Sequence, residues 1–312
     1  MRAATSRKVH DSDPPAAASL PRDLIQLLRP AQWSKNAILF GAILFSKHLF
    51  DRTALLRVLA AFASFCLVAS AAYVMNDLRD VERDRRHPQK KYRPIPSGRV
   101  QPALARVVFL IVGSAGIALA AALGGRFLLL VLFYLVWQVA YTFLMKEAVI
   151  LDVMALATGF VVRAVAGGFA IDVPVSPWLV ICTFLLALFM GFAKRRHEVV
   201  LLDASAADHR RSLREYSPYF LDQMIAVVTA STVVAYATYT VSPEVREKLG
   251  TEYLYLTIPF VLFGIFRYLY LVHQKEEGGN PTQLMLSDVP MIVDVLLWAL
   301  TAALLLYWGN PR

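Results

Sequence analysis

Charge, cysteine and histidine are all scarce in this chain. Only 18% of its 312 residues are charged and 57% are hydrophobic, a balance too apolar for an ordinary soluble domain. The two cysteines, Cys66 and Cys182, each lie inside an apolar run, so neither a disulfide framework nor a cysteine metal site is expected. The six histidines are scattered without an H-E-x-x-H pattern, which argues against a zinc site.

What the chain has instead is long apolar runs. A helix of roughly 20 residues crosses a hydrocarbon core about 30 Å thick, and nine spans of that kind are predicted. They lie at residues 32–50, 53–75, 102–123, 126–145, 149–170, 176–193, 220–241, 253–273 and 290–308. Because these runs lack the alternation of barrel strands, we predict an all-α polytopic membrane protein.

The net charge of +9 is concentrated in two loops, expected at about residues 76–101 and 194–217. Positive loops face the cytoplasm, so the N-terminus is predicted inside and, with nine spans, the C-terminus outside. Basic patches at a membrane surface meet lipid headgroups and anionic substrates, and no nucleic-acid partner is expected. Residues 1–20 lack apolar periodicity and are predicted to be a disordered tail, and residues 21–312 are predicted to form a single membrane domain.

The most informative stretch is residues 73–98, which contains Asn76, Asp77, Asp80 and Asp84 in an N-D-x-x-D-x-x-x-D pattern. On a continuous helix the three aspartates fall within an arc of roughly 60°. Like charges so placed repel each other, which indicates that a cation binds there. Carboxylate and amide oxygens suit Mg²⁺, which also takes substrate phosphates, so we predict a magnesium-diphosphate site. A solvated charged loop is the alternative.

Basic residues occur on both sides of this motif in the sequence. Lys90, Lys91 and Arg93 follow it and are suited to the outer oxygens of a diphosphate, although a topology signal would look similar. Lys35 lies beside Trp33 at the start of the first predicted span, where an interfacial anchor is an equally good interpretation.

Polar residues also accompany the fifth predicted span. Tyr141, Lys146 and Asp152 flank the short link that precedes it. Arg163 lies inside an otherwise apolar run, and an arginine at that depth usually faces a polar cavity or a paired group, so a substrate role competes with a structural one. Asp152 is expected near the same helix face, and Gly167 predicts close helix packing.

The second basic loop is expected to open with Lys194, Arg195, Arg196, His197 and Glu198. Lys194 and Glu198 are four residues apart, so both can point at one site, although an ordinary ion pair between them explains the spacing as well.

From about Arg22 onward the sequence resembles the UbiA superfamily of intramembrane prenyltransferases. The likeness rests on the motif at residues 76–84, the following Arg93-Pro94-x-x-Ser97-Gly98, the segment from Tyr141 to Lys146, and nine spans with two cytoplasmic loops. It implies a ring of helices around a central cavity open to the cytosol, with the first motif binding a diphosphate through Mg²⁺.

One departure from the family pattern narrows the resemblance. Most members carry a second aspartate-rich motif after the sixth span, where this chain has Lys194-Arg195-Arg196-His197-Glu198. Together with Arg29-Pro30-x-Gln32-Trp33-x-Lys35-Asn36, this resembles the branch of decaprenyl-phosphate phosphoribosyltransferases. The branch implies transfer of 5-phosphoribosyl from phosphoribosyl pyrophosphate (PRPP) to a polyprenyl phosphate, decaprenyl by the branch name, for the arabinan of the cell wall. It also implies a bacterial inner membrane, with the active site cytoplasmic, and leaves a homo-oligomer open.

The resemblance implies roles for particular residues. Asn76, Asp77, Asp80 and Asp84 would hold Mg²⁺ and the leaving diphosphate, and Asp152 would orient a basic group or a ribose hydroxyl. The residues expected to bind substrate are Lys35, Asn76, Lys90, Lys91, Arg93, Tyr141, Lys146, Arg163, Lys194, Arg195, Arg196 and Glu198. The expected chemistry is departure of diphosphate from ribose C1 and attack by the lipid phosphate. An aromatic prenyltransferase acting on 4-hydroxybenzoate, and a transporter or scaffold without chemistry, are the alternatives.

Overall fold

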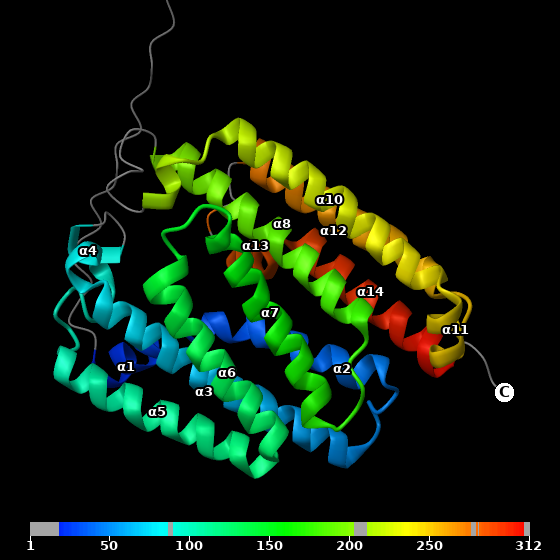
Figure 1. Ribbon diagram of the computed structural model, residues 1–312, viewed down its shortest axis with the longest axis horizontal. Coiled ribbons are helices and arrows are strands. Elements are labelled where there is room, and N and C mark those ends of the chain that lie inside the picture. The colour runs from blue at the N-terminus through cyan, green and yellow to red at the C-terminus, as the bar shows by residue number, and fades with distance from the viewer. Residues whose placement is uncertain (1–18, 87–89, 203–210, 276–278, 280, 309–312) are drawn as a thin grey trace, which may run out of the picture.

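The computed structural model describes residues 19–86, 90–202, 211–275, 279 and 281–308. Every regular element in these residues is helical, which confirms the all-α prediction (Figure 1). Eight helices are long and apolar enough to cross a membrane. They are α3 (Arg52–Arg79), α5 (Pro102–Leu123), α6 (Gly125–Ala140) with its continuation η3 (Tyr141–Met145), α7 (Leu151–Ala170), α8 (Pro177–Leu202), α10 (Pro218–Val241), α12 (Ile258–Gln274) with the preceding η6 (Leu254–Thr257), and α14 (Val289–Tyr307). The tail predicted to be disordered lies, as far as residue 18, outside the described residues.

Shorter helices connect or flank these spans. They are α1 (Leu20–Leu28), the 3₁₀ helix η1 (Pro30–Leu39), α2 (Phe40–Phe45), α4 (Val81–Arg86), η2 (Lys90–Tyr92), η5 (Arg211–Arg214), α11 (Pro243–Leu249) and α13 (Pro281–Ser287). Several spans begin at a capped end. At the start of α3, for example, the Asp51 carboxylate accepts hydrogen bonds from the backbone N–H groups of Thr53 (2.8 Å) and Ala54 (3.2 Å), which satisfies donors that have no partner within the helix.

The first predicted span differs from a simple helix. Residues 32–50 do not form one α-helix, because the ten residues of η1 are followed by only six of α2, which ends at Phe45. With rises of about 2.0 and 1.5 Å per residue, η1 and α2 together extend about 29 Å, close to the thickness of a hydrocarbon core. Lys47, with φ of 60°, turns the chain away after α2. A 3₁₀ run of this length is unusual and often marks a functional segment.

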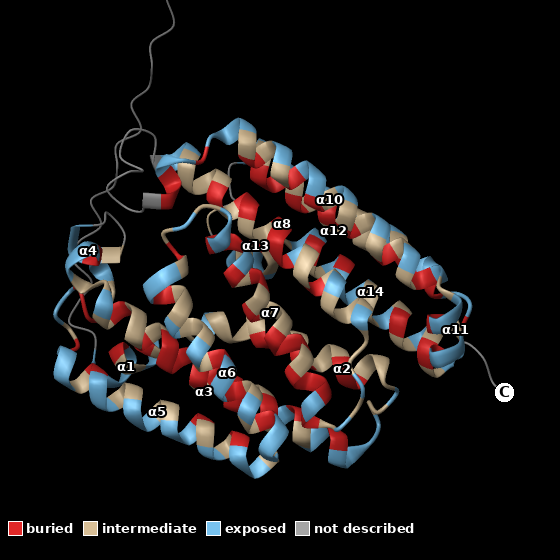
Figure 2. Ribbon diagram, in the orientation of Figure 1, coloured by how far each residue is buried: buried red, intermediate tan, exposed pale blue. Residues whose placement is uncertain are grey.

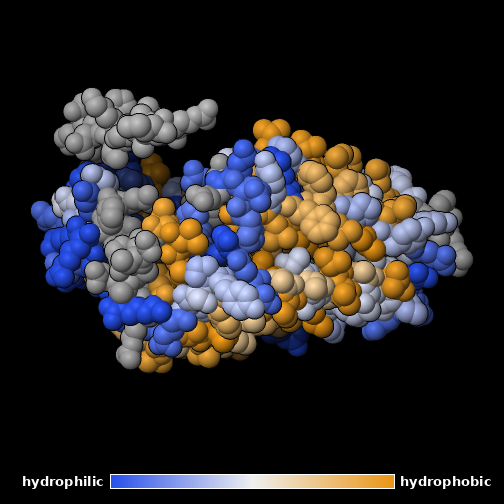
Figure 3. All heavy atoms as spheres, turned by 90° about the horizontal axis from the view of Figure 1, so that it is seen from above, coloured by the Kyte–Doolittle hydropathy of each residue, from blue (hydrophilic) through white to orange (hydrophobic). Residues whose placement is uncertain are grey.

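Helices α3 and α7 form the inner part of the molecule (Figure 2). In each of them 61% of the most apolar window is buried by the rest of the protein, against 17% in α5 and in α14. The outer helices carry exposed aliphatic side chains such as Leu110, Ile111 and Leu296. Such side chains are expected to meet lipid, since an apolar side chain gains nothing from burial when its surroundings are already apolar. In the space-filling view, apolar side chains cover much of this face, and the most hydrophilic ones gather at its left end and near its centre (Figure 3).

Helix α7 joins two hydrophobic cores. Val153 and Ala157 pack with α8, α10 and α12, and Val162 and Ala166 pack with α3 and α6. Gly167 lets η1 approach α7 closely, because a Cβ at this position would lie 2.2 Å from the carbonyl oxygen of Leu39. The prediction of close packing at Gly167 is therefore confirmed.

The two expected cytoplasmic loops contain more helix than predicted. Helix α3 continues to Arg79 and is followed at once by α4, and α8 continues to Leu202. The segment from Lys194 to Glu198 is therefore helical. Glu198 accepts from Arg195 one turn earlier, an i,i+3 pair that favours the helix. The part of the second loop at residues 203–210 lies outside the described residues.

Candidate active site

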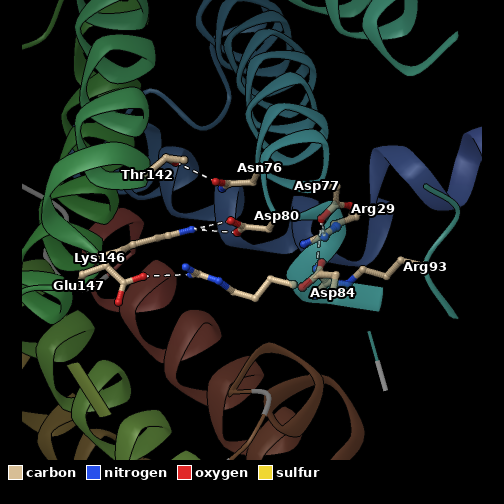
Figure 4. Close-up of polar contacts among 10 residues, drawn as sticks. Arg29, Asn76, Asp77, Asp80, Asp84, Arg93, Thr142, Lys146 and Glu147 are labelled. Carbon is tan, nitrogen blue, oxygen red and sulfur yellow. Dashed lines mark hydrogen bonds and ion pairs between the residues drawn. The ribbon is translucent and has the colours of Figure 1, made fainter. Parts of the chain in front are cut away.

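The acidic motif lies at a bend between two helices. Its aspartates therefore do not share the one continuous helix that the sequence spacing predicts. Asp80 ends α3 with φ of −94° and ψ of 10°, and α4 begins at the next residue. Helical hydrogen bonds continue through the bend, since the Asp80 N–H donates to the Asn76 carbonyl (2.9 Å) and the Asp84 N–H to the Asp80 carbonyl (2.8 Å). As a result Asp77 and Asp84 point to one side and Asp80 to another (Figure 4).

Asp77 and Asp84 are held together by arginines. One nitrogen of Arg93, Nη1, lies 3.1 Å from Asp77 Oδ1 and 2.7 Å from Asp84 Oδ2. Arg29, from the end of α1, forms a further ion pair with Asp77. Both aspartates are buried, and burial raises the pKa of the Asp84 carboxyl, although the Arg93 charge opposes that shift. A positive group thus already bridges the two carboxylates.

Asn76 and Asp80, the other two residues of the motif, face the end of α6 (Figure 4). Lys146 Nζ contacts both oxygens of Asp80, at 3.0 and 2.8 Å, and the Thr142 hydroxyl donates to Asn76 Oδ1 at 2.8 Å. Thr142 belongs to the π-helical turn η3, and Lys146 caps the end of this turn, where its N–H donates to the Tyr141 carbonyl at 3.0 Å. Such π turns occur frequently at functional sites. Here the extra residue per turn brings Lys146 to the motif.

A second buried cluster surrounds Asp152 at the start of α7. Arg195 Nε donates to Asp152 Oδ2 at 2.7 Å, and the Tyr216 hydroxyl donates to Asp152 Oδ1 at 2.8 Å. Arg195 also pairs with Glu198 at 2.5 Å. Just before the helix, Ile150 has φ of 67°, a strained conformation for a β-branched residue, and its N–H donates to the Tyr216 hydroxyl at 2.6 Å. The cluster fixes the guanidinium of Arg195 on the face of α8 that meets α7.

Arg163 lies on α7 about three helical turns beyond Asp152 and has partners of its own. Its guanidinium donates to Asn36 Oδ1 (2.8 Å), the Gly159 carbonyl (3.0 Å) and the Tyr134 hydroxyl (2.6 Å). None of these three partners carries a charge. The arginine is buried, so the structure places a full positive charge inside the membrane domain.

Tyr73, on α3, contacts one of the arginines that bind the motif. Its ring lies under the Arg29 guanidinium, with 5.0 Å between the Arg29 Cζ and the ring centroid.

Lys90, Lys91 and Arg196, which are also predicted to bind substrate, have different surroundings. Lys90 lies near Asp84, and burial lowers the pKa of the Lys90 ammonium. Lys91 lies over the ring of its own neighbour Tyr92, at 5.0 Å. Arg196 points toward α10, where it pairs with Asp222 at 2.5 Å, and so does not join the cluster formed by Arg195.

Three residues at this site had no functional assignment from the sequence. Arg29 is 48 positions from Asp77, and Tyr216 is 64 positions from Asp152. No local pattern links residues so far apart, because helix packing alone brings them together. Tyr73 lies three residues before Asn76, close to one helical turn, and this spacing is the sequence signal that places it beside the acidic motif.

The donor atoms suit magnesium. Among the described residues, no group of three or more His, Cys, Asp or Glu is arranged to hold a metal by itself. Mg²⁺ does not need such a group, since it usually binds one or two carboxylates together with substrate phosphates. One nitrogen of Arg93 contacts both Asp77 and Asp84, so these two carboxylates face one shared positive group.

A family model for the UbiA prenyltransferase family matches residues 37–289. The chain belongs to the UbiA prenyltransferase family. Among curated UbiA relatives, decaprenyl-phosphate phosphoribosyltransferase from Corynebacterium glutamicum is 32% identical over 93% of this chain and 88% of its own. The enzyme of the same name from Mycobacterium tuberculosis strain H37Rv is 31% identical over 96% and 98%.

Solved structures support the UbiA fold. A UbiA homologue from Archaeoglobus fulgidus, bound to GPP and Mg²⁺, superposes with a TM-score of 0.69 at 18% identity, covering 90% of this chain and 98% of the other. The predicted family and its all-helical membrane fold are therefore confirmed. The sequence likeness to the phosphoribosyltransferases extends over most of the chain.

Proposed function

We propose that this protein transfers the 5-phosphoribosyl group of PRPP to a polyprenyl phosphate, releasing diphosphate. The observation that carries the proposal is the charge on α8, where Lys194 and Arg195 stand in place of the second acidic motif of the family pattern, whereas the adjacent Arg196 pairs with Asp222. A prenyl diphosphate brings one anionic group, whereas this reaction assembles a diphosphate, a 5-phosphate and a lipid phosphate. Extra cations match that load.

The residues of the acidic motif would hold Mg²⁺ and the diphosphate of PRPP. When bound, the metal would supply positive charge that stabilises the leaving diphosphate. Asn76, Asp77, Asp80 and Asp84 provide the oxygen ligands. Arg29 and Arg93 contact the same carboxylates, so they are placed to donate hydrogen bonds to a diphosphate bound beside them.

The chemistry requires positioning more than proton transfer. The bond from ribose C1 to the diphosphate oxygen breaks, and its electron pair leaves with diphosphate. A new bond forms between C1 and an oxygen of the lipid phosphate, which is already anionic at neutral pH and needs no general base. We therefore assign Asp152 the role of holding Arg195 in place, consistent with the 2.7 Å contact between them.

The site is proposed to face the cytoplasm from a bacterial inner membrane. The acidic motif lies in the first of the two segments in which the sequence concentrates positive charge, residues 76–101 and 194–217, and positive segments stay inside. PRPP would then reach the site from the cytoplasm and the lipid from the bilayer.

One assay tests the function against its competitor. Purified protein in detergent with Mg²⁺ is offered labelled PRPP plus polyprenyl phosphate, or polyprenyl diphosphate plus 4-hydroxybenzoate. We expect lipid-soluble labelled phosphoribose in the first mixture only, abolished by a chelator. Prenylated 4-hydroxybenzoate in the second mixture alone would favour the aromatic prenyltransferase, and no product in either would leave the transporter or scaffold interpretation.

A matched pair of variants tests the metal site by a second readout. Asp77→Asn keeps the shape of the side chain and removes its charge, and Asp172→Asn makes the same change at an exposed surface pair with Arg57. We expect Mg²⁺ with diphosphate to raise the thermal unfolding temperature of wild type and Asp172→Asn but not of Asp77→Asn. An equal rise in all three proteins would remove Asp77 from the metal site.

A further inference from the structure

Arg29 and Arg93 reach the acidic motif from two separate segments of the chain. Arg29 is the residue that ends α1, and Arg93 lies in the turn formed by residues 90–98. Both guanidinium groups contact Asp77, and Arg93 also contacts Asp84 (Figure 4). The placement of these two cations therefore depends on how α1 and the turn are held against each other.

Neither segment fixes its arginine by local structure alone. Helix α1 has only nine residues, and helices shorter than about 12–15 residues are marginal in isolation. Arg29 has φ of 54° and ψ of 60°, a left-handed conformation that a non-glycine residue keeps only where its surroundings hold it. Regular structure within the turn, whose residues are all described, is limited to the three residues of η2. Contacts from elsewhere must hold both segments.

Arg99 connects the two segments with a single side chain. Its Nη1 atom pairs with Asp23 of α1 at 2.5 Å, and its Nη2 atom donates to the Gln26 side chain of α1 at 3.1 Å and to the Tyr92 carbonyl of the turn at 2.6 Å. Asp23 is 2% exposed, so the ion pair is shielded from water. Because a guanidinium is planar and its donors form a rigid fork, these contacts fix α1 and the turn at one relative position.

A short chain of hydrogen bonds extends from Arg99 to the backbone of Arg93. Arg99 Nε donates to the Ser97 hydroxyl at 3.1 Å, and this hydroxyl donates to the Arg93 carbonyl at 2.6 Å. Tyr92, whose carbonyl accepts from Arg99, directly precedes Arg93. Arg99 therefore holds the chain on both sides of Arg93. Within the described residues, Arg99 itself makes no hydrogen bond or ion pair with the aspartates of the motif.

Apolar packing closes the same junction. Leu27 of α1 is 1% exposed and packs in one core with Val74 of α3, Ile95 of the turn and Val100. Such packing keeps α1 attached, but the hydrophobic effect has no preferred direction. The charged contacts of Arg99 are directional, so they set the angle at which α1 presents its last residue to the motif.

We propose that Arg99 is a positioning residue for the donor diphosphate, because it holds α1 and the turn so that Arg29 and Arg93 stay directed at a diphosphate bound beside Asp77. The assignment rests on the proposed function and deepens it, since it names the group that orders the two arginines in advance. Donors ordered in advance bind an anion more tightly, because little conformational freedom is lost on binding. Arg99 therefore acts on the donor PRPP and not on the lipid acceptor.

The test compares Arg99→Met with Arg106→Met, the same change at an exposed arginine of α5. Binding of diphosphate with Mg²⁺ to the purified protein in detergent is measured by calorimetry, and KM is measured separately for PRPP and for polyprenyl phosphate. We expect Arg99→Met to weaken diphosphate binding and to raise KM for PRPP by about tenfold, on the order of one charge-assisted hydrogen bond. KM for polyprenyl phosphate should change less than about twofold, and Arg106→Met should match wild type.

A second pair of variants tests whether the effect passes through Arg29. Asp23→Asn weakens only the contact of Arg99 with α1, and it should raise KM for PRPP in the wild-type background. In an Arg29→Met background the same change should have little further effect, because the side chain whose position it sets is already absent. Effects of Asp23→Asn and Arg29→Met that simply add would overturn this path.

Other outcomes would overturn the assignment as a whole. An Arg99→Met protein that unfolds at a lower temperature but binds diphosphate with Mg²⁺ as wild type does would limit Arg99 to stability. An equal rise in KM for both substrates would mean a general distortion of the site. If Arg99→Met does not fold, Arg99→Lys keeps the charge without reaching all four partners, and unchanged diphosphate binding in that variant would also refute the assignment.

The binding measurement separates this assignment from the proposed function, because it requires no transfer reaction. A wild-type protein that transfers no phosphoribose, but whose binding of diphosphate with Mg²⁺ is weakened by Arg99→Met, would refute the proposed function and leave the positioning role standing.

Discussion

The buried pair of Asp152 and Arg195 gives the sharpest test of how this site is held. Asp152 is fully buried and Arg195 is 2% exposed. Asp152→Asn removes the charge that opposes Arg195 and weakens two charge-assisted hydrogen bonds, those from Arg195 and Tyr216. Each such bond contributes about 1.5–3 kcal/mol. Because Arg195 keeps its contact with Glu198, we expect a loss of about 3 kcal/mol, near the lower end for breaking a buried pair.

The assay is thermal unfolding in detergent, where a loss of this size lowers the unfolding temperature by roughly 5–10 °C on the scale of soluble domains. The double variant Asp152→Leu with Arg195→Met replaces the pair by apolar side chains. We expect it to regain most of the lost stability, since an unpaired buried charge costs more than an absent pair. We also expect the double variant to lack phosphoribosyl transfer, because Arg195 is proposed to bind substrate.

Two results would refute this reasoning. A double variant as unstable as the sum of its single changes would mean that packing, not charge, dominates the position. A stable and fully active double variant would mean that the pair is structural and that Arg195 has no part in binding substrate.

Two further predictions concern packing and capping. Gly167→Ala should lower the free energy of unfolding by about 3 kcal/mol, since its Cβ would lie 2.2 Å from the Leu39 carbonyl oxygen. Gly113→Ala, whose Cβ would make only an ordinary van der Waals contact, should raise it by about 0.5–1 kcal/mol. Unfolding temperatures that rank the two variants in the opposite order would contradict the packing described here. Asp288 caps α14, and the hydrogen bond from Arg267 holds the pKa of the Asp288 carboxyl below its ordinary value. The ionised carboxyl therefore stabilises the protein above about pH 4. That contribution is lost as the pH falls through the lowered pKa. Asp288→Ala should therefore be about 1 kcal/mol less stable than wild type at pH 7, and the difference should shrink near pH 3; a difference independent of pH would refute the charge contribution.

Several features could be predicted from local sequence. The spans follow from hydropathy, because a run of about 20 apolar residues enters lipid whatever its neighbours do. Spacing alone identifies the acidic motif and the basic residues that follow it. The first span at residues 32–50 is only partly predictable, since hydropathy does not distinguish an α-helix from a 3₁₀ helix followed by a short α-helix. The bend at Asp80 is not predictable for a similar reason, because the polar sequence around it allows a continuous helix equally well.

The sequence by itself determined that this chain lies in a membrane, is built of helices and carries separate acidic and basic motifs, because each of these depends on neighbouring residues alone. Only the tertiary structure decided which charges meet. It pairs Asp77 with Arg29 and Asp152 with Arg195, and it leaves Arg163 among neutral groups. Electrostatic interactions act through space and weaken with distance, so the order of residues along the chain could not reveal which cations remain available for a substrate.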